Sequence, residues 1–183
     1  NFYIDILNKI DRVLNEASIE TKIAFLAYFE LLWPPDKKLV NEDRFILMFA
    51  PITRTFSYPM SKDDNNSIEL ETFKLNENKF PSNIGENIKY LNAWKQIFKG
   101  DSFIFDYHFM WDGLKEITNI DLSSILNQDI KHIQTLGLNG YISCQLTRNA
   151  FPNALGLNVL GEALLNGIAN YDIYAKSYYM TKY

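Results

Sequence analysis

The sequence predicts an α/β fold in which parallel strands alternate with helices. Four short apolar runs, each bounded by polar or turn-forming residues, have the length and composition of strands buried on both faces; they span 22–28, 45–50, 102–107 and 140–144. The connections between these runs are long enough for parallel pairing. Amphipathic stretches at helical spacing precede the first run, separate the later runs and come after the last.

The helical stretches can be bounded from their apolar spacing and from the residues that stop them. The chain opens on one such stretch, and a pair of prolines at 34–35 prevents a helix from crossing that point. The next two stretches end at Gly100 and Gly137, which are typical C-terminal caps. The expected helices are therefore 2–14, 84–98, 122–136, 157–165 and 171–183.

One internal segment, 61–80, is too polar to form a buried element. It contains two adjacent aspartates beside two asparagines, and it has few apolar residues beyond them. We expect an excursion loop that is poorly ordered.

Composition excludes several classes of function. The chain has 183 residues, of which 47% are hydrophobic, and its net charge is −4, with no cluster of Lys and Arg. This composition suits one soluble globular domain and argues against a nucleic-acid partner. The single cysteine, Cys144, cannot form an internal disulfide, and no run reaches the roughly 20 apolar residues that span a bilayer. Because the sequence begins at Asn1 without a methionine or a signal peptide, we expect a fragment of a longer polypeptide.

Two architectures accommodate four parallel strands. One is a small doubly wound sheet that is complete by itself, and the other is half of a (β/α)₈ barrel, which as a whole has about 250 residues. No Gly-x-Gly-x-x-Gly and no Walker-type phosphate loop comes after any strand, so the commonest ligands of the doubly wound sheet are not indicated.

Polar and aromatic residues gather where each apolar run ends. The carboxyl ends of parallel strands share one edge of the sheet, where ligand sites are built. Aromatic faces stack on pyranose rings, and Arg, Asp, Gln and His bind hydroxyl groups, so this mixture predicts a sugar ligand. The alternative for any one residue is a structural role, such as a buried ion pair. The candidate substrate-binding residues are Tyr28, Glu30, Trp33, Arg54, Tyr107, His108, Trp111, Gln145 and Arg148, with Phe56 and Tyr58 nearby.

Asp106 is the candidate for an acid–base or transition-state-stabilising role. Glycoside hydrolysis usually needs two carboxyl groups, and the other acids near strand ends are Glu30 and Asp112. A metal is not expected, because the only histidines are His108 and His132. No cofactor is expected either. A structural role is favoured for Cys144, since no histidine-based pair accompanies it.

The strand-end motifs, taken in order, resemble landmarks of a known family. The motifs are Leu26-Ala-Tyr28 with Pro34-Pro35 after it, then Phe49 to Arg54 with Phe56 and Pro59, then Phe105 to Asp112, then Gly137 to Gln145. They resemble the bacterial family called domain of unknown function 4838 over most of the chain. Residues 154–164 and the tyrosine-rich end are similar to the segment that comes after the barrel in that family.

The resemblance implies a glycoside-hydrolase-like barrel, similar to the β-N-acetylhexosaminidases of glycoside hydrolase family 20 and to α-glucuronidases. By that analogy the four strands are barrel strands five to eight, residues 1–170 are the C-terminal half of the barrel, and 171–183 begin another helical segment. The catalytic acids of family 20 would then lie before Asn1. Many members carry an acidic or aromatic residue where this chain has Ser143-Cys144, so no role is transferred there.

The resulting prediction is the substrate-binding rim of a glycoside hydrolase, inactive as an isolated fragment. A non-catalytic carbohydrate-binding or structural domain is the main alternative, and a complete doubly wound ligand-binding domain is a third. The expected partners are a carbohydrate and either the N-terminal half of the barrel or a second copy, with no nucleic acid and no membrane. The compartment stays open between a bacterial cytoplasm and secretion.

Overall fold

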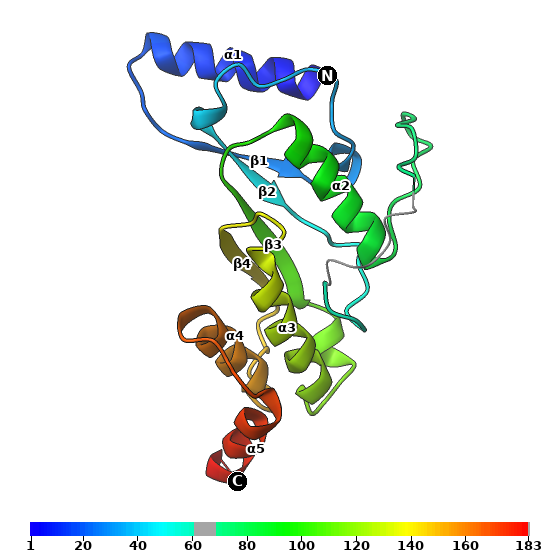
Figure 1. The fold of residues 1–183 in the computed structure, drawn as a ribbon, viewed down its shortest axis with the longest axis vertical. Coiled ribbons are helices and arrows are strands. Elements are labelled where there is room, and N and C mark those ends of the chain that lie inside the picture. Colours follow the sequence, from blue (N-terminus) through cyan, green and yellow to red (C-terminus); the bar gives the residue numbers. More distant parts are fainter. Residues whose placement is uncertain (61–68, 183) are drawn as a thin grey trace.

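A computed structural model describes residues 1–60 and 69–182 (Figure 1). In chain order the elements are α1 (Phe2–Glu16), β1 (Ile23–Ala27), η1 (Phe29–Leu32), η2 (Glu42–Arg44), β2 (Phe45–Phe49), α2 (Ile84–Ile97), β3 (Ser102–Phe109), η3 (Asp112–Leu114), α3 (Ile120–Ile133), β4 (Gly140–Gln145), α4 (Leu155–Leu165) and α5 (Tyr171–Lys182). The expected strands and helices are all present, with ends that differ by a few residues.

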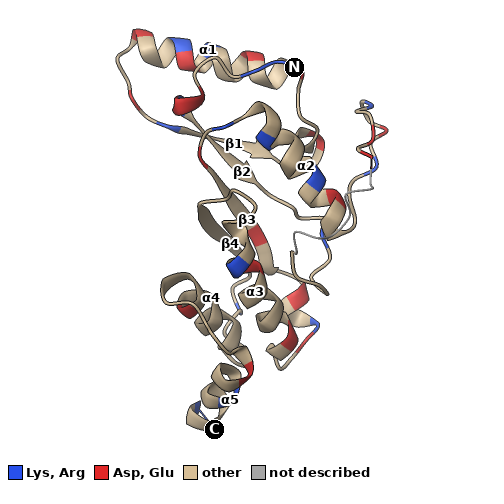
Figure 2. Ribbon diagram, viewed as in Figure 1, with Lys and Arg blue, Asp and Glu red and all other residues tan. Residues whose placement is uncertain are grey.

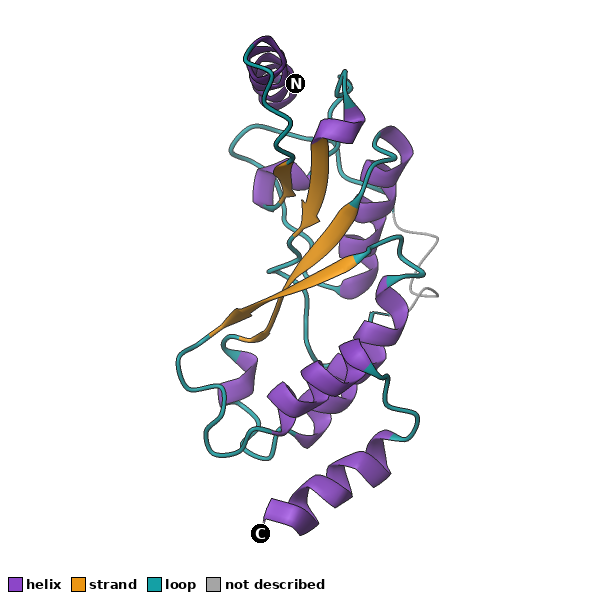
Figure 3. Ribbon diagram, turned by 90° about the vertical axis from the view of Figure 1, so that its left-hand side faces the viewer, coloured by secondary structure: helices purple, strands orange, loops and turns teal. Residues whose placement is uncertain are grey.

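The four strands form one parallel sheet in the order β1-β2-β3-β4. This confirms that the apolar runs pair as neighbours in sequence order. A doubly wound sheet reverses its strand order at a switch point and carries helices on both faces. Here the order runs in one direction and α2 and α3 cover the same face, so the doubly wound alternative is wrong (Figures 1 and 3).

The main core lies between the sheet and its helices. Phe25, Leu47, Phe49 and Ile104 point from the three strands β1 to β3 into this layer and have no exposed surface. The α2 stripe faces them and includes Trp94, whose ring lies 5.6 Å from that of Phe25. The indole Nε1 donates a hydrogen bond to the carbonyl of Leu31 at 3.0 Å, so this large ring is buried without an unsatisfied donor.

The opposite face of the sheet, termed the open face, is also apolar but is not covered. In the strand register, side chains that pair across neighbouring strands point to the same side, which groups Leu26 with Met48 and Phe103, and Phe105 with Ile142. These side chains are half-buried, apart from Ile142, which is 46% exposed. Among the described residues, no helix packs over the row of Leu26, Met48 and Phe103 (Figure 3), whereas at the carboxyl edge Leu122 of α3 shares an apolar cluster with Tyr107.

A buried ion pair secures α1 at the amino edge of the sheet. The Arg44 Nε atom lies 2.9 Å from Asp11 Oδ1, and Arg44 also donates to the carbonyls of Ile19 and Thr21. The Tyr3 hydroxyl of the same helix accepts a hydrogen bond from the Leu26 amide on the unpaired side of β1. Charge and hydrogen bonding therefore fix α1 beside the first strand.

The C-terminal helices pack against α3 and against the carboxyl end of β3. α4 and α5 share an apolar cluster with α3 and Phe109. Tyrosines of α5 hold this arrangement: the Tyr178 hydroxyl accepts from the Ala154 amide at 2.9 Å, and the Tyr171 hydroxyl donates to the carbonyl of Ile120 at 2.5 Å. Residues 171–182 are thus docked on the helices before them. Among the described residues, no helix combines the length and the apolar character needed to cross a membrane.

The polar segment expected to be an excursion falls partly outside the described residues, which omit 61–68. Its remainder, 69–80, contains neither a helix nor a strand. The Trp33 indole Nε1 donates a hydrogen bond to the Glu71 carbonyl at 2.7 Å, which connects residues 69–80 to the segment after η1.

Candidate functional site at the carboxyl edge of the sheet

Asp106 is the only Asp, Glu, Lys or Arg within the four strands, and it lies near the carboxyl end of β3 (Figure 2). A carboxylate in an otherwise apolar strand needs compensating partners if it is buried. Asp106 has no exposed surface, and its two partners are Arg54 from the loop after β2 and His108 two residues later in β3. Both partners also face Asp129, from the middle of α3.

These four side chains form a closed network, termed the charge network. The His108 ring contacts both carboxylates: Nδ1 lies 2.5 Å from Asp106 Oδ2, and Nε2 lies 3.3 Å from Asp129 Oδ2. Arg54 likewise faces both acids, with Nη2 2.9 Å from Asp129 Oδ2 and Nη1 3.9 Å from Asp106 Oδ1. All four are buried, and Arg54 is the most exposed at 4%.

The network determines the protonation states of its members. Burial alone would lower the pKa of His108, but the charge of Asp106 and hydrogen bonds to Asp106 and Asp129 outweigh burial and raise the pKa. Burial would raise the pKa of Asp106, yet the charge and hydrogen bond of His108, and then the charge of Arg54, hold that pKa below its usual value. The geometry therefore favours an imidazolium beside a carboxylate.

The charge network also holds the loop after β2. Arg54 donates from Nε to the carbonyl of Thr55 and from Nη2 to the carbonyl of Tyr58, at 3.2 and 3.1 Å. The Met60 amide donates to Asp129 Oδ1. The Phe56 ring packs on the network from the same loop, with its centroid 4.8 Å from that of His108 and 4.6 Å from Arg54 Cζ. One cluster of charges thus connects residues 54–60 to β3 and α3.

A second group of side chains gathers at the same edge but on the open face. Tyr28, Tyr107 and Cys144 come from the ends of β1, β3 and β4 and share one apolar cluster with Phe105. Burial raises the pKa of the Tyr107 phenol, with smaller contributions from Tyr28 and Cys144, because these groups lie near one another. Tyr28 and Phe105 are only partly buried, whereas Tyr107 is buried in the same cluster as Leu122 of α3 and Phe56 of the loop after β2.

Tyr28, Arg54, Asp106 and Gln145 all lie at the carboxyl edge of the sheet, but their side chains point to different sides of it. Asp106 and Arg54 lie on the helix-covered side, whereas Tyr28 belongs to the open face. Alternation along a strand is the physical reason, since successive side chains point to opposite sides. Gln145 is exposed at the end of β4, and its Oε1 accepts a hydrogen bond from Asn149 Nδ2 at 3.4 Å.

The remaining candidates are spread over different surfaces. Trp111 is 55% exposed after β3. Arg148 is exposed and lines a cavity of about 180 Å³ at the ends of β3 and β4, together with Phe109, Met110 and Phe151. Trp33 is instead folded into the main core, and it lines, with Glu30, a groove of about 720 Å³ between α1, the segment after η1 and residues 70–73.

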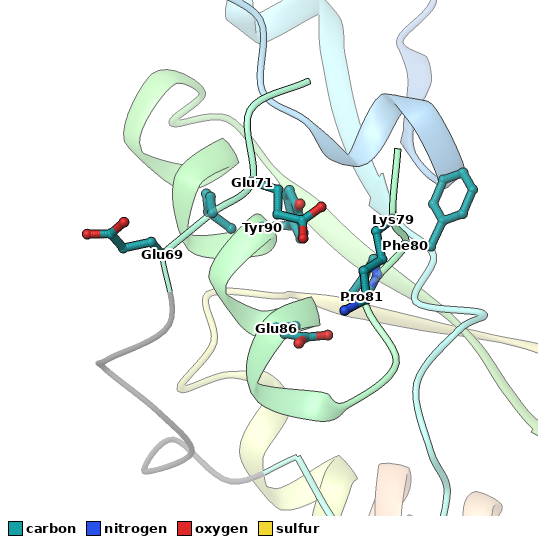
Figure 4. Close-up of a pocket in the computed structure, with 8 residues that line it drawn as sticks. Glu69, Glu71, Lys79, Phe80, Pro81, Glu86 and Tyr90 are labelled. Carbon is teal, nitrogen blue, oxygen red and sulfur yellow. The ribbon is translucent and has the colours of Figure 1, made fainter. Parts of the chain in front are cut away.

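A third cavity, of about 120 Å³, contains none of the residues singled out from the sequence (Figure 4). Glu71, Glu86 and Tyr90 line it opposite Lys79 and Phe80. Burial, and then the charges of Glu71 and Glu86, raise the pKa of Tyr90 to about 12. Among the described residues, no group of three or more His, Cys, Asp and Glu side chains is placed to hold a metal ion.

Asp129 is the site residue that sequence reasoning missed. A signal for it exists: Asp129 lies on the same helical stripe as Leu126 and Ile133, where an apolar side chain is expected. An acid on the buried side of an amphipathic helix requires a buried partner.

Comparison of this chain with protein-family models, with curated proteins and with solved structures found no match.

Proposed function

We propose that this chain is the C-terminal half of a (β/α)₈-type barrel from a glycoside-hydrolase-like protein, and that it contributes a carbohydrate-binding rim. The observation that carries the proposal is the parallel sheet in strict chain order, with helices on one face and an apolar open face that ends in an aromatic edge. The resemblance of the strand-end motifs to domain of unknown function 4838 supports the same assignment.

The open face supports the barrel. Parallel sheets occur with both faces covered, because βα units leave neither face suited to water. In a barrel the inward face is covered by the strands opposite it, and the helices stay outside. Four more strands, from the N-terminal half or from a second copy, would cover Met48, Phe103 and Ile142 and would pair the free edges of β1 and β4.

The carboxyl edge supports a sugar ligand. Tyr28 is partly buried on the side that would face the barrel axis, with the buried Tyr107 beside it, and Trp111 is exposed just beyond β3. Aromatic rings of this kind stack on the apolar faces of pyranoses. Gln145 and Arg148 add an amide and a guanidinium for hydroxyl groups at the end of β4.

Asp106 favours a binding role over a catalytic one for this half. An acid that protonates a leaving group must reach the substrate, but Asp106 has no exposed surface and is held between His108 and Arg54. The carboxylates of a hydrolase would then come from the other half of the barrel, as the resemblance implies. A non-catalytic carbohydrate-binding domain is the second candidate, and the same burial favours it.

Three proteins distinguish these possibilities: residues 1–183, the longer polypeptide that the proposal implies, and its Asp106→Asn variant. All are assayed on a panel of aryl glycosides and titrated calorimetrically with oligosaccharides. We expect turnover by the longer polypeptide and by its Asp106→Asn variant, because the buried Asp106 does not reach the substrate. Residues 1–183 should show only weak sugar binding, because acid–base assistance contributes about 10²- to 10⁴-fold to such reactions.

Robust hydrolysis by residues 1–183 would overturn the argument that the catalytic acids lie elsewhere and would make Glu30 and Asp106 the candidate pair. Sugar binding by the longer polypeptide without turnover would establish the non-catalytic alternative. Trp111→Ala serves as the binding-site variant, and Leu165→Ala, whose side chain is 83% exposed on α4, is its matched control.

A further inference from the structure

The His108 ring faces a carboxylate oxygen from each of its two nitrogens. A neutral imidazole has one N–H, so it could donate to only one of the two acids, and its other nitrogen would face a negative charge. An imidazolium donates from Nδ1 to Asp106 and places its second N–H group, on Nε2, 3.3 Å from Asp129, where it forms an ion pair but no aligned hydrogen bond. It also balances the charge, since Arg54 and His108 together carry +2 against the −2 of Asp106 and Asp129.

The charge network reaches beyond the sheet through the loop after β2. Asp129 accepts from the Met60 amide, while Arg54 donates to the Tyr58 carbonyl, so both ends of the segment 54–60 are tied to one network. The segment is otherwise short of regular structure: it contains neither a helix nor a strand. Its conformation therefore depends on the network and on the burial of Phe56 and Met60, and not on a backbone ladder of its own.

The same segment, which follows the carboxyl end of β2, has an exposed aromatic side chain. Tyr58 is 66% exposed, although its carbonyl is held at 3.1 Å from a buried guanidinium. A fixed backbone with a free ring is the arrangement that a stacking residue needs, because less conformational freedom is lost when the ligand binds.

We propose that Asp129 and the His108 imidazolium are positioning residues, which latch the 54–60 loop so that Tyr58 stands at the rim as a ligand-contacting ring. The identity of the ligand, a carbohydrate, rests on the proposed function. The effect of Asp129 and His108 on the conformation of the 54–60 loop does not. Buried ion pairs add little net stability compared with apolar packing, whereas they do specify geometry. The burial of four charged groups costs desolvation free energy, which is consistent with a role in positioning the loop.

Loss of the proton from the His108 imidazolium is expected to release the 54–60 loop from the charge network. The charged groups that face His108 are Asp106 from β3, Asp129 from α3 and Arg54 from the loop. Tyr141 from β4 lies near the two acids, and burial and then the charges of both acids raise its pKa. Loss of the imidazolium proton leaves the network with a net charge of −1 and removes one donor from an acid.

The latch is tested by hydrogen exchange and by histidine NMR on the proposed full-length protein, with and without variants. Asp129→Leu removes the acceptor of the Met60 amide, and we expect exchange of that amide to accelerate by about tenfold. Asp11→Leu is the matched control, because it breaks the other buried aspartate–arginine pair, at the amino edge, and should leave the loop unaffected. Equal acceleration of Met60 exchange in both variants would overturn the latch.

Asp129→Asn removes the negative charge of this side chain while keeping nearly the same shape, so it tests the effect of the charge on His108. With one negative charge removed, Arg54 alone balances Asp106, so the His108 ring should become neutral at a lower pH than in the unaltered protein, as read from its ¹⁵N shifts. A ring that is neutral at pH 7 before any substitution would contradict the imidazolium.

The contribution of Tyr58 is measured with an oligosaccharide by a double-mutant cycle. Tyr58→Ala should weaken binding by about fivefold to tenfold on its own and by much less in the Asp129→Leu background. Equal losses in both backgrounds would show that the latch does not position the ring. If no oligosaccharide binds to any form, the proposed function fails, while the exchange and NMR results still decide whether the latch exists.

Discussion

At the scale of single residues, the charge network shows how one acid in a strand organises its surroundings. Asp106 is stabilised as a carboxylate by His108 and Arg54, and Asp129 provides the second acid that makes a doubly paired imidazolium favourable. Removal of any one partner would leave an uncompensated buried charge, which costs about 3–5 kcal/mol. The protonation of the network is therefore coupled to folding.

We expect the free energy of unfolding to decline on the alkaline side, in part through His108. The pKa of His108 is raised in the folded state, so its contribution is complete below the unfolded value of about 6.5 and is lost as the pH rises through the folded value. Asp106, whose pKa is lowered, contributes above its unfolded value of about 3.9 and loses that contribution as the pH falls.

The measurement is urea unfolding of the unaltered protein and of His108→Gln from pH 5 to pH 10. The difference in free energy between them should be largest at the acidic end and should shrink with increasing pH. A difference that does not change with pH would show that His108 does not titrate in this range.

At the scale of elements, packing of α4 on α3 depends on a glycine whose neighbours leave no room for a methyl group. A Cβ atom at Gly156 would lie 2.7 Å from Phe109 Cε1 and 3.5 Å from Ser123 Oγ. Gly161 belongs to the same helix, and a Cβ atom there would meet nothing within 4 Å. One helix thus contains a glycine required by packing and a glycine that is not.

We expect alanine to have opposite effects at these two positions. Gly161→Ala should stabilise the protein by about 0.5–1 kcal/mol, because alanine is the better helix former and meets no steric conflict. Gly156→Ala should destabilise it by about 1–3 kcal/mol, because the Phe109 ring must move within a packed cluster. Chemical denaturation of both variants gives the two values. Stabilisation by Gly156→Ala would mean that α4 is not packed closely on Phe109.

At the scale of the whole molecule, the uncovered sheet is the dominant feature. Leu26, Met48 and Phe103 form a continuous apolar row across three strands, and within the described part of the chain neither β1 nor β4 pairs with a further strand on its outer edge. Surfaces of this kind promote association. The Tyr3 hydroxyl satisfies one amide on the β1 edge, so β4 is the more available of the two edges.

Residues 1–183 alone are therefore expected to self-associate through the open face and the β4 edge. Ile142→Glu, at a side chain that is 46% exposed on β4, should shift sedimentation velocity profiles toward the monomer. Leu165→Glu places the same charge on α4, at a side chain that is 83% exposed, and should have no such effect. A monomer at high concentration before any substitution would contradict the expectation.

The candidate site was predictable in part, and the reasons differ between residues. Arg54, Asp106 and His108 could be selected from the sequence because polar residues are conspicuous at the end of an apolar run. Their grouping with Asp129 could not, since α3 is connected to β3 by a loop whose geometry sets which helix residue faces the strand. Trp33 was expected at the rim, but its ring lies against Tyr90 at 4.8 Å in the main core, because the chain after β1 folds back over the helix layer.

The sequence by itself determined the order and type of the elements, since apolar runs and helical stripes are local patterns that reflect burial. The tertiary structure alone decided which side of the sheet each strand residue faces and which side the helices cover. The sequence alone predicts that Tyr107 and Asp106 point to opposite faces of the sheet, because they are neighbours in a strand. Only the packing of α3 determines that the face of Asp106 is the covered one. Alternation along a strand assigns residues to two faces, but it does not say which face is buried until another element packs on one of them.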